Sequence, residues 1–152
     1  MTIHLASDHA GFEMKEMLKK YITSLDFTVV DHGAFTYKAD DDYPDFIAKA
    51  AKAVSDNPQK DLGIILGGSG EGEAIVANKF RHVRATVFYG GDKEIIKLSH
   101  AHNDANMLSL GARFITDDDA KHVVRQWLLE HFSLGARHKR RIAKIEKLEK
   151  GV

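Results

Sequence analysis

Two short segments combine glycine with acidic, basic or hydroxyl side chains, the residue types that bind anions and move protons. They read Ser7-Asp8-His9-Ala10-Gly11 and Gly67-Gly68-Ser69-Gly70-Glu71-Gly72-Glu73. The second segment lacks the lysine of a P-loop, breaks the dinucleotide-binding spacing because position 73 is glutamate, and misses the nucleophile-elbow pattern. ATP binding, NAD binding and serine hydrolysis are therefore disfavoured.

The glycines around Ser69 predict a set of accessible backbone N–H groups at the start of a helix, which suits a phosphate or an oxyanion. A carboxylate at such a place needs another role, and Glu71 and Glu73 are the candidates. Two residues apart on a helix, they cannot both point into one pocket. The alternative is that both only stabilise the helix dipole, as acidic residues in a first turn often do.

Three other groups have both a chemical and a structural interpretation. Asp8 and His9 could act on a ligand or could hydrogen-bond their own loop. The segment His100-Ala101-His102-Asn103-Asp104 could suggest metal ligands, but no further ligand stands at convincing spacing, so ordinary surface polarity is favoured. Arg137 and Arg141 lie four apart, where two guanidinium groups can converge on one phosphate, although such a basic cluster is more often a solvated face or a nucleic-acid contact.

Short β-rich runs alternate with amphipathic stretches, which predicts an α/β fold with a parallel sheet covered by helices on both faces. Strands are expected at Ile3–Ser7, Phe27–Val30, Leu62–Leu66, Arg84–Phe88 and Met107–Leu110. Helices are expected at Phe12–Leu25, with Lys15 on its polar side, and at about Pro44–Ser55, Glu73–Phe80, Asp92–His100, Thr116–His131 and Arg137–Lys150. Ligands bind beyond the carboxyl ends of such strands, so the turns after the first and third strands are the expected site.

The composition predicts a single domain over residues 1–152. Lys+Arg and Asp+Glu balance at 22 each, so a nucleic-acid partner and a membrane surface are disfavoured. The chain has no cysteine and its first residues lack a leader pattern, so a cytoplasmic location is expected. The helix at about 137–150 carries only a thin apolar stripe, Ile142, Ile145 and Leu148, and is long enough to lie across a neighbouring subunit.

Taken together, the motifs resemble those of the ribose-5-phosphate isomerase B family, which includes galactose-6-phosphate and allose-6-phosphate isomerases. They are the two segments above, Ala77-Asn78-Lys79, His102-Asn103, Gly111-Ala112-Arg113 and Arg137-His138-Lys139-Arg140-Arg141. The resemblance implies a Rossmann-like three-layer sandwich with a five-stranded parallel sheet. It also implies a homodimer or homotetramer with sites near the subunit interface, and no metal or organic cofactor.

The resemblance further implies an aldose–ketose isomerase acting on ribose 5-phosphate and ribulose 5-phosphate through an enediolate. One branch of the family has a catalytic cysteine where Gly67 stands here, and the other has a glutamate at position 73, so this chain resembles the glutamate branch. Glu73 would be the base, His102 would open the sugar ring, and Ser69 would help to stabilise the developing charge. The implied substrate-binding residues are Asp8, His9, Gly68, Gly70, Gly72, Asn103, Arg113, Arg137 and Arg141.

Two alternatives stay open at this point. A six-carbon sugar 6-phosphate of the allose or galactose type would need a different pocket length, which the loop Phe35–Tyr43 would set. A non-catalytic sugar-phosphate or nucleotide sensor would keep the fold and the arginines, but it would gain little from Glu73 and His102.

Overall fold

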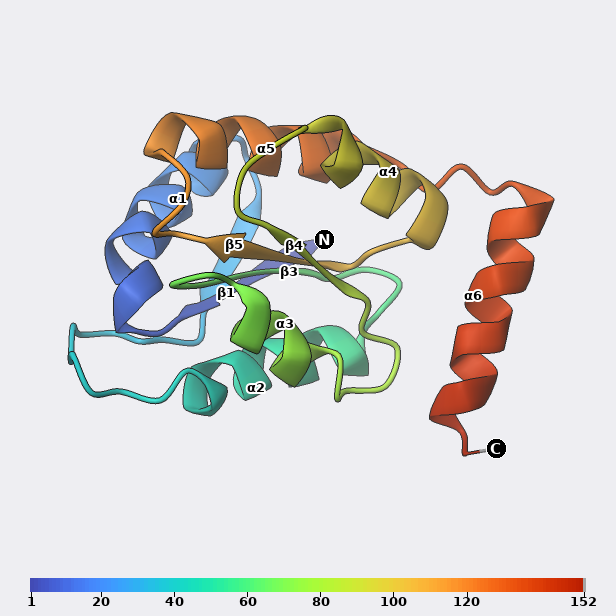
Figure 1. Cartoon of the computed structure of the whole chain (residues 1–152), viewed down its shortest axis with the longest axis horizontal. Helices are drawn as coiled ribbons and strands as arrows, with labels where there is room; N and C mark the ends of the chain where they lie inside the picture. Colours follow the sequence, from blue (N-terminus) through green and yellow to red (C-terminus); the bar gives the residue numbers. More distant parts are fainter. Residues whose placement is uncertain (152) are drawn as a thin grey trace.

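The computed structural model describes residues 1–151, and all strands of its central sheet run parallel (Figure 1). The strands are β1 (Thr2–Ser7), β2 (Thr28–Asp31), β3 (Leu62–Gly67), β4 (Ala85–Phe88) and β5 (Met107–Gly111). They are arranged in the order β2-β1-β3-β5-β4, so β3 is central and β2 and β4 are the edges. The predicted five-stranded parallel sheet is thus confirmed within the described residues.

Helices cover both faces of this sheet, as predicted. They are α1 (Phe12–Ser24), α2 (Pro44–Asp56), α3 (Glu71–Ala77), α4 (Glu94–Asn103), α5 (Asp117–Leu129) and α6 (Ala136–Glu149), with a short 3-10 turn, η1 (His9–Gly11), before α1. Helices α1, α4 and α5 lie on one face and α2 and α3 on the other, whereas α6 stands beside the sheet (Figure 1). Among residues 1–151, no helix has the length and apolar character needed to cross a membrane.

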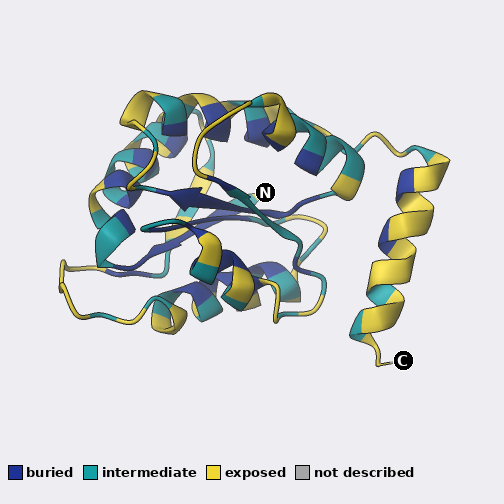
Figure 2. Cartoon of the chain, viewed as in Figure 1, coloured by how far each residue is buried: buried dark blue, intermediate teal, exposed yellow. Residues whose placement is uncertain are grey.

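Alternating side chains of the strands build two apolar layers. Ile3 and Leu5 of β1 pack in the layer beneath α1 and α5, together with the fully buried Trp127. Ala6 belongs to the opposite layer, with Ile47 of α2. Each aliphatic side chain so buried contributes about 1.5–3 kcal/mol of transfer free energy. Figure 2 shows the buried residues concentrated in the sheet and on the sides of the helices that face it.

Lys15 differs from the expectation that it would lie on the polar side of its helix. Its side chain is fully buried, and its Nζ lies 2.7 Å from Asp31 Oδ2 and 2.8 Å from Glu16 Oε1. Charged groups are tolerated in the interior only when they are paired in this way. Asp31 also accepts a hydrogen bond from the backbone N–H of Gly33, so the ion pair fixes the turn that follows β2.

Helices α3 and α4 also differ in their bounds from the sequence prediction, and α3 ends at Ala77 rather than Phe80. Helix α3 begins at Glu71 rather than Glu73, because Gly70 adopts a left-handed φ of 80° and the helix starts directly after it. Helix α4 continues to Asn103 rather than stopping near His100, and it ends where Asp104 adopts a left-handed φ of 49°. The predicted cap at Thr116 is confirmed, since its side chain accepts a hydrogen bond from the backbone N–H of Asp119.

Candidate active site

The turns after β1, β3 and β5 lie side by side at the carboxyl edge of the sheet. Ser7 pairs with Leu66, and Gly67 pairs with Gly111, so the residues that follow each strand meet at one place. The connection is direct, because the backbone N–H of Arg113 donates to the carbonyl of Gly68 at 3.1 Å. This arrangement brings together the predicted residues Asp8, His9, Glu73 and Arg113. They lie around the turn Gly67–Gly72, called here the glycine loop, which contains Ser69.

The glycine loop is pressed against β5, and this contact explains one glycine of the loop and one at the end of β5. A Cβ on Gly70 would lie 3.0 Å from the backbone carbon of Leu110, and one on Gly111 would lie 2.6 Å from the Ser69 carbonyl. Ser109 Oγ donates to the Gly70 carbonyl, which ties the loop to the sheet. Gly70 is therefore needed for backbone packing and for its positive φ. The loop is thus packed closely against the sheet and hydrogen-bonded to it.

The two carboxylates of the loop have different environments. Glu73 is only 4% exposed, whereas Glu71 is exposed. A Cβ on Gly67 would overlap the Glu73 carboxylate, so that carboxylate occupies the space that a side chain at position 67 would fill. Burial raises the pKa of Glu73 and the charge of Asp8 raises it further, while a hydrogen bond from its own backbone N–H opposes both effects. The structure therefore provides a buried carboxyl group that binds a proton more readily than an exposed glutamate.

Ser69 and Gly72 have local partners as well. Ser69 Oγ accepts a hydrogen bond of 3.3 Å from the backbone N–H of Glu71, which is the ordinary behaviour of a serine before a helix. A Cβ on Gly72 would lie 2.9 Å from the hydroxyl of Tyr43, at the start of α2. Tyr43 therefore covers the glycine loop near Glu73. Sequence reasoning assigned it no individual role.

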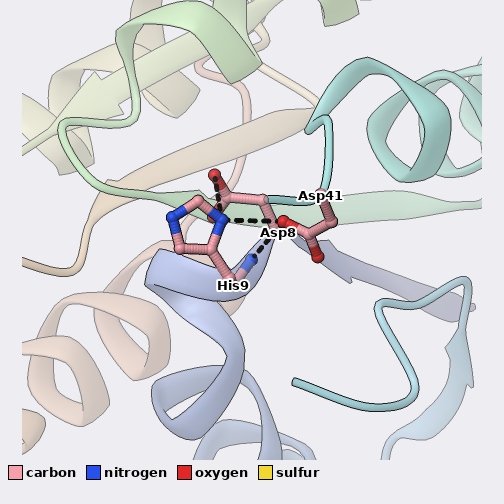
Figure 3. Close-up of side chains that lie close together, drawn as sticks. All are labelled: Asp8, His9 and Asp41. Atoms are coloured by element: carbon pink, nitrogen blue, oxygen red, sulfur yellow. Dashed lines mark hydrogen bonds and ion pairs between the residues drawn. The ribbon is translucent and has the colours of Figure 1, made fainter. Parts of the chain in front are cut away.

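Asp8 and His9 form a second polar cluster at this edge, with Asp41 from the loop before α2 (Figure 3). Asp8 Oδ1 accepts hydrogen bonds from the backbone N–H groups of Ala10 and Gly11, so the loop-capping interpretation holds for this oxygen. Its Oδ2 lies 3.8 Å from His9 Nδ1. That same ring nitrogen lies 2.7 Å from Asp41 Oδ1, which also accepts the backbone N–H of His9 at 2.9 Å.

Sequence reasoning included Asp41 only as part of the loop Phe35–Tyr43 and gave it no role of its own. Two facts available from the sequence point toward it. The loop follows the second strand, whose carboxyl end lies at the same edge as the first, and the run Asp40-Asp41-Asp42 precedes Tyr43 and Pro44 at a predicted helix start.

The ligand atoms of Asp8, His9 and Asp41 lie within 4.8 Å of one another, a spacing that could hold a divalent cation. The 2.7 Å contact between His9 Nδ1 and Asp41 Oδ1 is, however, a hydrogen-bond distance. In this conformation these two possible ligand atoms are hydrogen-bonded to each other.

Arg113 supplies positive charge beside the glycine loop. A Cβ on Gly68 would lie 3.3 Å from Arg113 Nη1, so the guanidinium extends along the loop backbone, and the residue is exposed. Backbone N–H groups at the start of a helix, next to an exposed guanidinium, favour an anionic ligand at this edge.

The remaining predicted residues, His102, Asn103, Arg137 and Arg141, lie at the other end of the sheet. His102 and Asn103 end α4, which returns the chain to the amino end of β5. The five residues of β5, at about 3.3 Å each, put roughly 15 Å between the two ends. One chain therefore holds two separate groups of predicted site residues.

This second group, at the amino end, is organised around His138. The rings of His102 and His138 have centroids 4.4 Å apart, and Arg137 Nε lies 3.1 Å from His138 Nε2. Burial, and then the charges of His102, Arg137 and Arg141, lower the pKa of His138. Asn103, Arg137 and Arg141 themselves are exposed. The group is a cationic surface that no acidic residue of the glycine loop reaches.

A cavity of about 560 Å³ lies between α6 and β4, next to this group. Its lining includes Asn103, Arg84 and the apolar side chains of Ile145 and Leu148. On α6, Ile142 is buried, but Ile145 is 40% and Leu148 65% exposed. The thin stripe predicted for this helix is thus only partly covered by its own chain.

Comparison with known proteins assigns the chain to a family of isomerases. The model of the ribose/galactose isomerase family matches residues 3–145. The chain is 39% identical to ribose-5-phosphate isomerase B of Mycolicibacterium paratuberculosis over 99% of its own length and 92% of that protein. It is equally similar to a probable ribose-5-phosphate isomerase B of Mycoplasma genitalium, at 39% identity over 97% of this chain and 95% of the relative.

Solved structures agree with this assignment. The Mycoplasma genitalium ribose-5-phosphate isomerase B with bound ribulose 5-phosphate superposes with a TM-score of 0.94, at 38% identity, and covers 99% of this chain and 97% of its own. The Clostridium thermocellum enzyme gives a TM-score of 0.91 at 37% identity, over 99% of this chain and 98% of its own.

The chain therefore belongs to the ribose/galactose isomerase family, and it is an isomerase. Within that family it falls among proteins of the ribose-5-phosphate isomerase B type, so the resemblance inferred from the motifs is confirmed. Its assignment to the glutamate branch stays a prediction.

Proposed function

We propose that this isomerase interconverts ribose 5-phosphate and ribulose 5-phosphate, with Glu73 as the base. The observation that carries the proposal is the buried Glu73 carboxyl, which sits against Gly67 at the head of the glycine loop. The substrate follows from the relatives, one of which holds ribulose 5-phosphate in its structure.

Aldose–ketose exchange requires a group that takes a proton from C2 of the aldose and returns it to C1. The Glu73 carboxylate takes the C2 proton, the electrons of the C–H bond form the C1–C2 double bond, and the carbonyl oxygen becomes an enediolate oxygen. The resulting carboxylic acid then protonates C1, while the C2 hydroxyl gives its proton to the C1 oxygen and becomes the ketose carbonyl. The raised pKa of Glu73 makes its carboxylate a better proton acceptor than an exposed glutamate.

The negative charge on the enediolate needs donors that are already in place. The backbone N–H groups of the loop 68–72 open α3, and Gly70 and Ser109 hold that loop against β5. Donors fixed in this way stabilise the transition state without reorganising, which typically contributes a factor of 10²–10³ for each donor. Ser69 lies in the same loop and supplies a hydroxyl next to these groups. Asp8, beside Glu73, would hold the sugar hydroxyls.

The residues for phosphate binding and ring opening are divided between the two ends of the sheet. His9 and Arg113 lie at the carboxyl edge, near Glu73, whereas His102, Asn103, Arg137 and Arg141 lie at the amino end. A single chain cannot apply both groups to one small sugar phosphate. We therefore propose that a second copy of the chain delivers its amino-end group to this carboxyl edge.

A two-fold symmetric dimer satisfies this requirement, because each chain then gives one group and receives the other. The incompletely covered stripe on α6 and the cavity beside β4 provide apolar surface for such an interface. In each of the two sites, the partner's imidazole at position 102 would open the furanose ring, and its arginines would clamp the phosphate. The proposed assembly is a homodimer or a pair of dimers.

Turnover assays with ribose 5-phosphate, allose 6-phosphate and galactose 6-phosphate, with a chelator present, test this proposal. Glu73→Gln should abolish turnover while sugar-phosphate binding persists. The matched control is Glu71→Gln, which makes the same chemical change two residues away at an exposed position. Near-normal activity of Glu73→Gln would remove this residue from the base role.

The same assays separate the alternatives. Preference for a six-carbon substrate would keep the mechanism. The longer pocket would then be assigned to the exposed loop that carries Phe35 and Tyr37. Binding of all three sugar phosphates without turnover of any would identify a sensor.

A further inference from the structure

Asp41 is buried although it comes from an otherwise exposed loop. Its side chain is only 8% exposed, while residues 35–40 are all exposed. The buried carboxylate is directed at a single residue, His9. Its Oδ1 accepts both the backbone N–H of His9, at 2.9 Å, and the ring Nδ1–H, at 2.7 Å (Figure 3).

This contact determines which ring nitrogen of His9 carries a proton. A carboxylate can only accept hydrogen bonds, so Nδ1 must be the donor. Asp8 Oδ2, at 3.8 Å from the same nitrogen, places a second acceptor on that side of the ring. Nε2 is then the atom left for a ligand, and the His9 side chain keeps 23% of its surface exposed.

A second contact from the same loop fixes the plane of the ring. The ring of Tyr37 meets His9 edge to face, with centroids 6.3 Å apart and an interplanar angle of 85°. Tyr37 also contacts Phe12 at the start of α1, with centroids 6.5 Å apart. Asp41 and Tyr37 thus hold His9 from one loop, by a hydrogen bond and by ring packing respectively.

We propose that Asp41 is a positioning residue for substrate recognition, which fixes the tautomer and orientation of His9 so that Nε2 faces the bound sugar phosphate. The inference rests on the proposed function, because it assigns His9 to substrate binding. Asp41 itself touches no reacting atom. It acts only through His9, so its loss changes substrate binding more than the chemical step.

Steady-state kinetics of three variants test this role. Asp41→Ala removes the acceptor and should raise KM about tenfold, with kcat changed less than about threefold, since losing one charge-assisted hydrogen bond costs about that factor. Asp41→Asn retains an acceptor oxygen and should recover part of the loss. Asp40→Asn makes the same charge change at the adjacent, exposed position and should match the unmodified protein.

A measurement that does not depend on turnover keeps this inference separate from the proposed function. In protein labelled with ¹⁵N-histidine, the ring shifts of His9, assigned by their absence in His9→Gln, should report Nδ1–H in the unmodified protein. Asp41→Ala should give a mixture of tautomers, and inorganic phosphate should shift the His9 Nε2 signal less in that variant than in Asp40→Asn.

Three results would overturn the proposal. In the first, Asp41→Ala has the same KM as Asp40→Asn. In the second, kcat falls at unchanged KM. In the third, the His9 tautomer is unaffected by the substitution. If Asp41→Ala fails to fold, the shifts and KM of Asp41→Asn decide between the same outcomes.

Discussion

The carboxyl edge of the sheet and the cationic group at its amino end are built in different ways. At the carboxyl edge, Glu73 is 4% exposed and its loop is held by close backbone contacts between Gly70 and β5. At the amino end, Arg137 and Arg141 project from a helix that stands beside the domain and is mostly exposed (Figure 2). The proposed base needs a fixed, desolvated position, which one chain supplies by folding. The proposed phosphate clamp would be completed by assembly.

The largest expected effect comes from filling the space beside Glu73, the proposed base. Gly67→Ala places a methyl group where the Glu73 carboxylate lies, and displacing that carboxylate should lower kcat/KM by about 10²–10⁴-fold, the usual worth of a positioned base. Gly135→Ala is the control, because Gly135 has an ordinary φ of −58° and a Cβ there would meet nothing closer than 3.5 Å. Equal kinetics for the two variants would show that the carboxylate is not needed where it sits.

The division of the site between chains can be tested by mixing defective subunits. Glu73→Gln and the double variant Arg137→Ala/Arg141→Ala should each be nearly inactive alone. When an equal mixture exchanges subunits at random, about half of the dimers are mixed, and each mixed dimer contains one intact site out of two. The mixture should therefore recover about a quarter of normal activity. Exchange would be verified by mass spectrometry. Mixed dimers that form but stay inactive would place both groups of residues in one chain's site.

A smaller effect is expected when one arginine of the proposed phosphate clamp is removed. Arg137→Ala should raise KM for ribose 5-phosphate about tenfold with little change in kcat, because one charge-assisted contact contributes roughly 1.5–3 kcal/mol. Lys139→Ala removes one positive charge from the same exposed helix and serves as the control. An unchanged KM for Arg137→Ala would indicate that the residue belongs only to the helix surface.

The smallest effect is a dependence of stability on pH that arises away from both groups. Burial lowers the pKa of His32, whose Nε2 lies 2.9 Å from His4 Nδ1, and the positive charge of His4 lowers it further. At His32 the unfolded chain therefore binds a proton more readily than the folded one. The contribution of neutral His32 to the free energy of unfolding is thus complete above pH 6.5, and it decreases as the pH falls toward the folded-state pKa.

Urea unfolding at pH 7.5 and 5.5, at one protein concentration, should show a lower free energy of unfolding at the acidic pH. The decrease should be smaller in His32→Gln, whereas the exposed His122→Gln should leave it unchanged. A pH dependence unaffected by His32→Gln would assign it to other groups, such as the half-buried His100, whose pKa is also lowered by burial.

The fold could be predicted because its signals are local. The apolar run of β3 and the Thr116 cap depend on neighbouring residues, and both appear in the structure. The start of α3 was predicted two residues late, because it depends on the positive φ of Gly70 and on its contact with β5. The sequence does not reveal a contact between distant segments of this kind.

The site was predictable only in part for the same reason. Glu73 and Asp8 follow strands whose carboxyl ends meet, so their proximity follows from a parallel sheet. The contact between Asp41 and His9 depends on the path of a long loop, and no periodic pattern in the sequence predicts that path. The position of His102 was open to deduction, because a helix that connects parallel strands returns the chain to the opposite edge.

The overlap between Gly67 and the Glu73 side chain also couples these two positions during evolution. A cysteine at position 67 cannot be accommodated while the glutamate keeps its place, because even the first carbon of a side chain there would overlap the carboxylate. Any residue other than glycine at position 67 therefore requires Glu73 to be shortened or turned away, so the two positions are expected to change together in evolution.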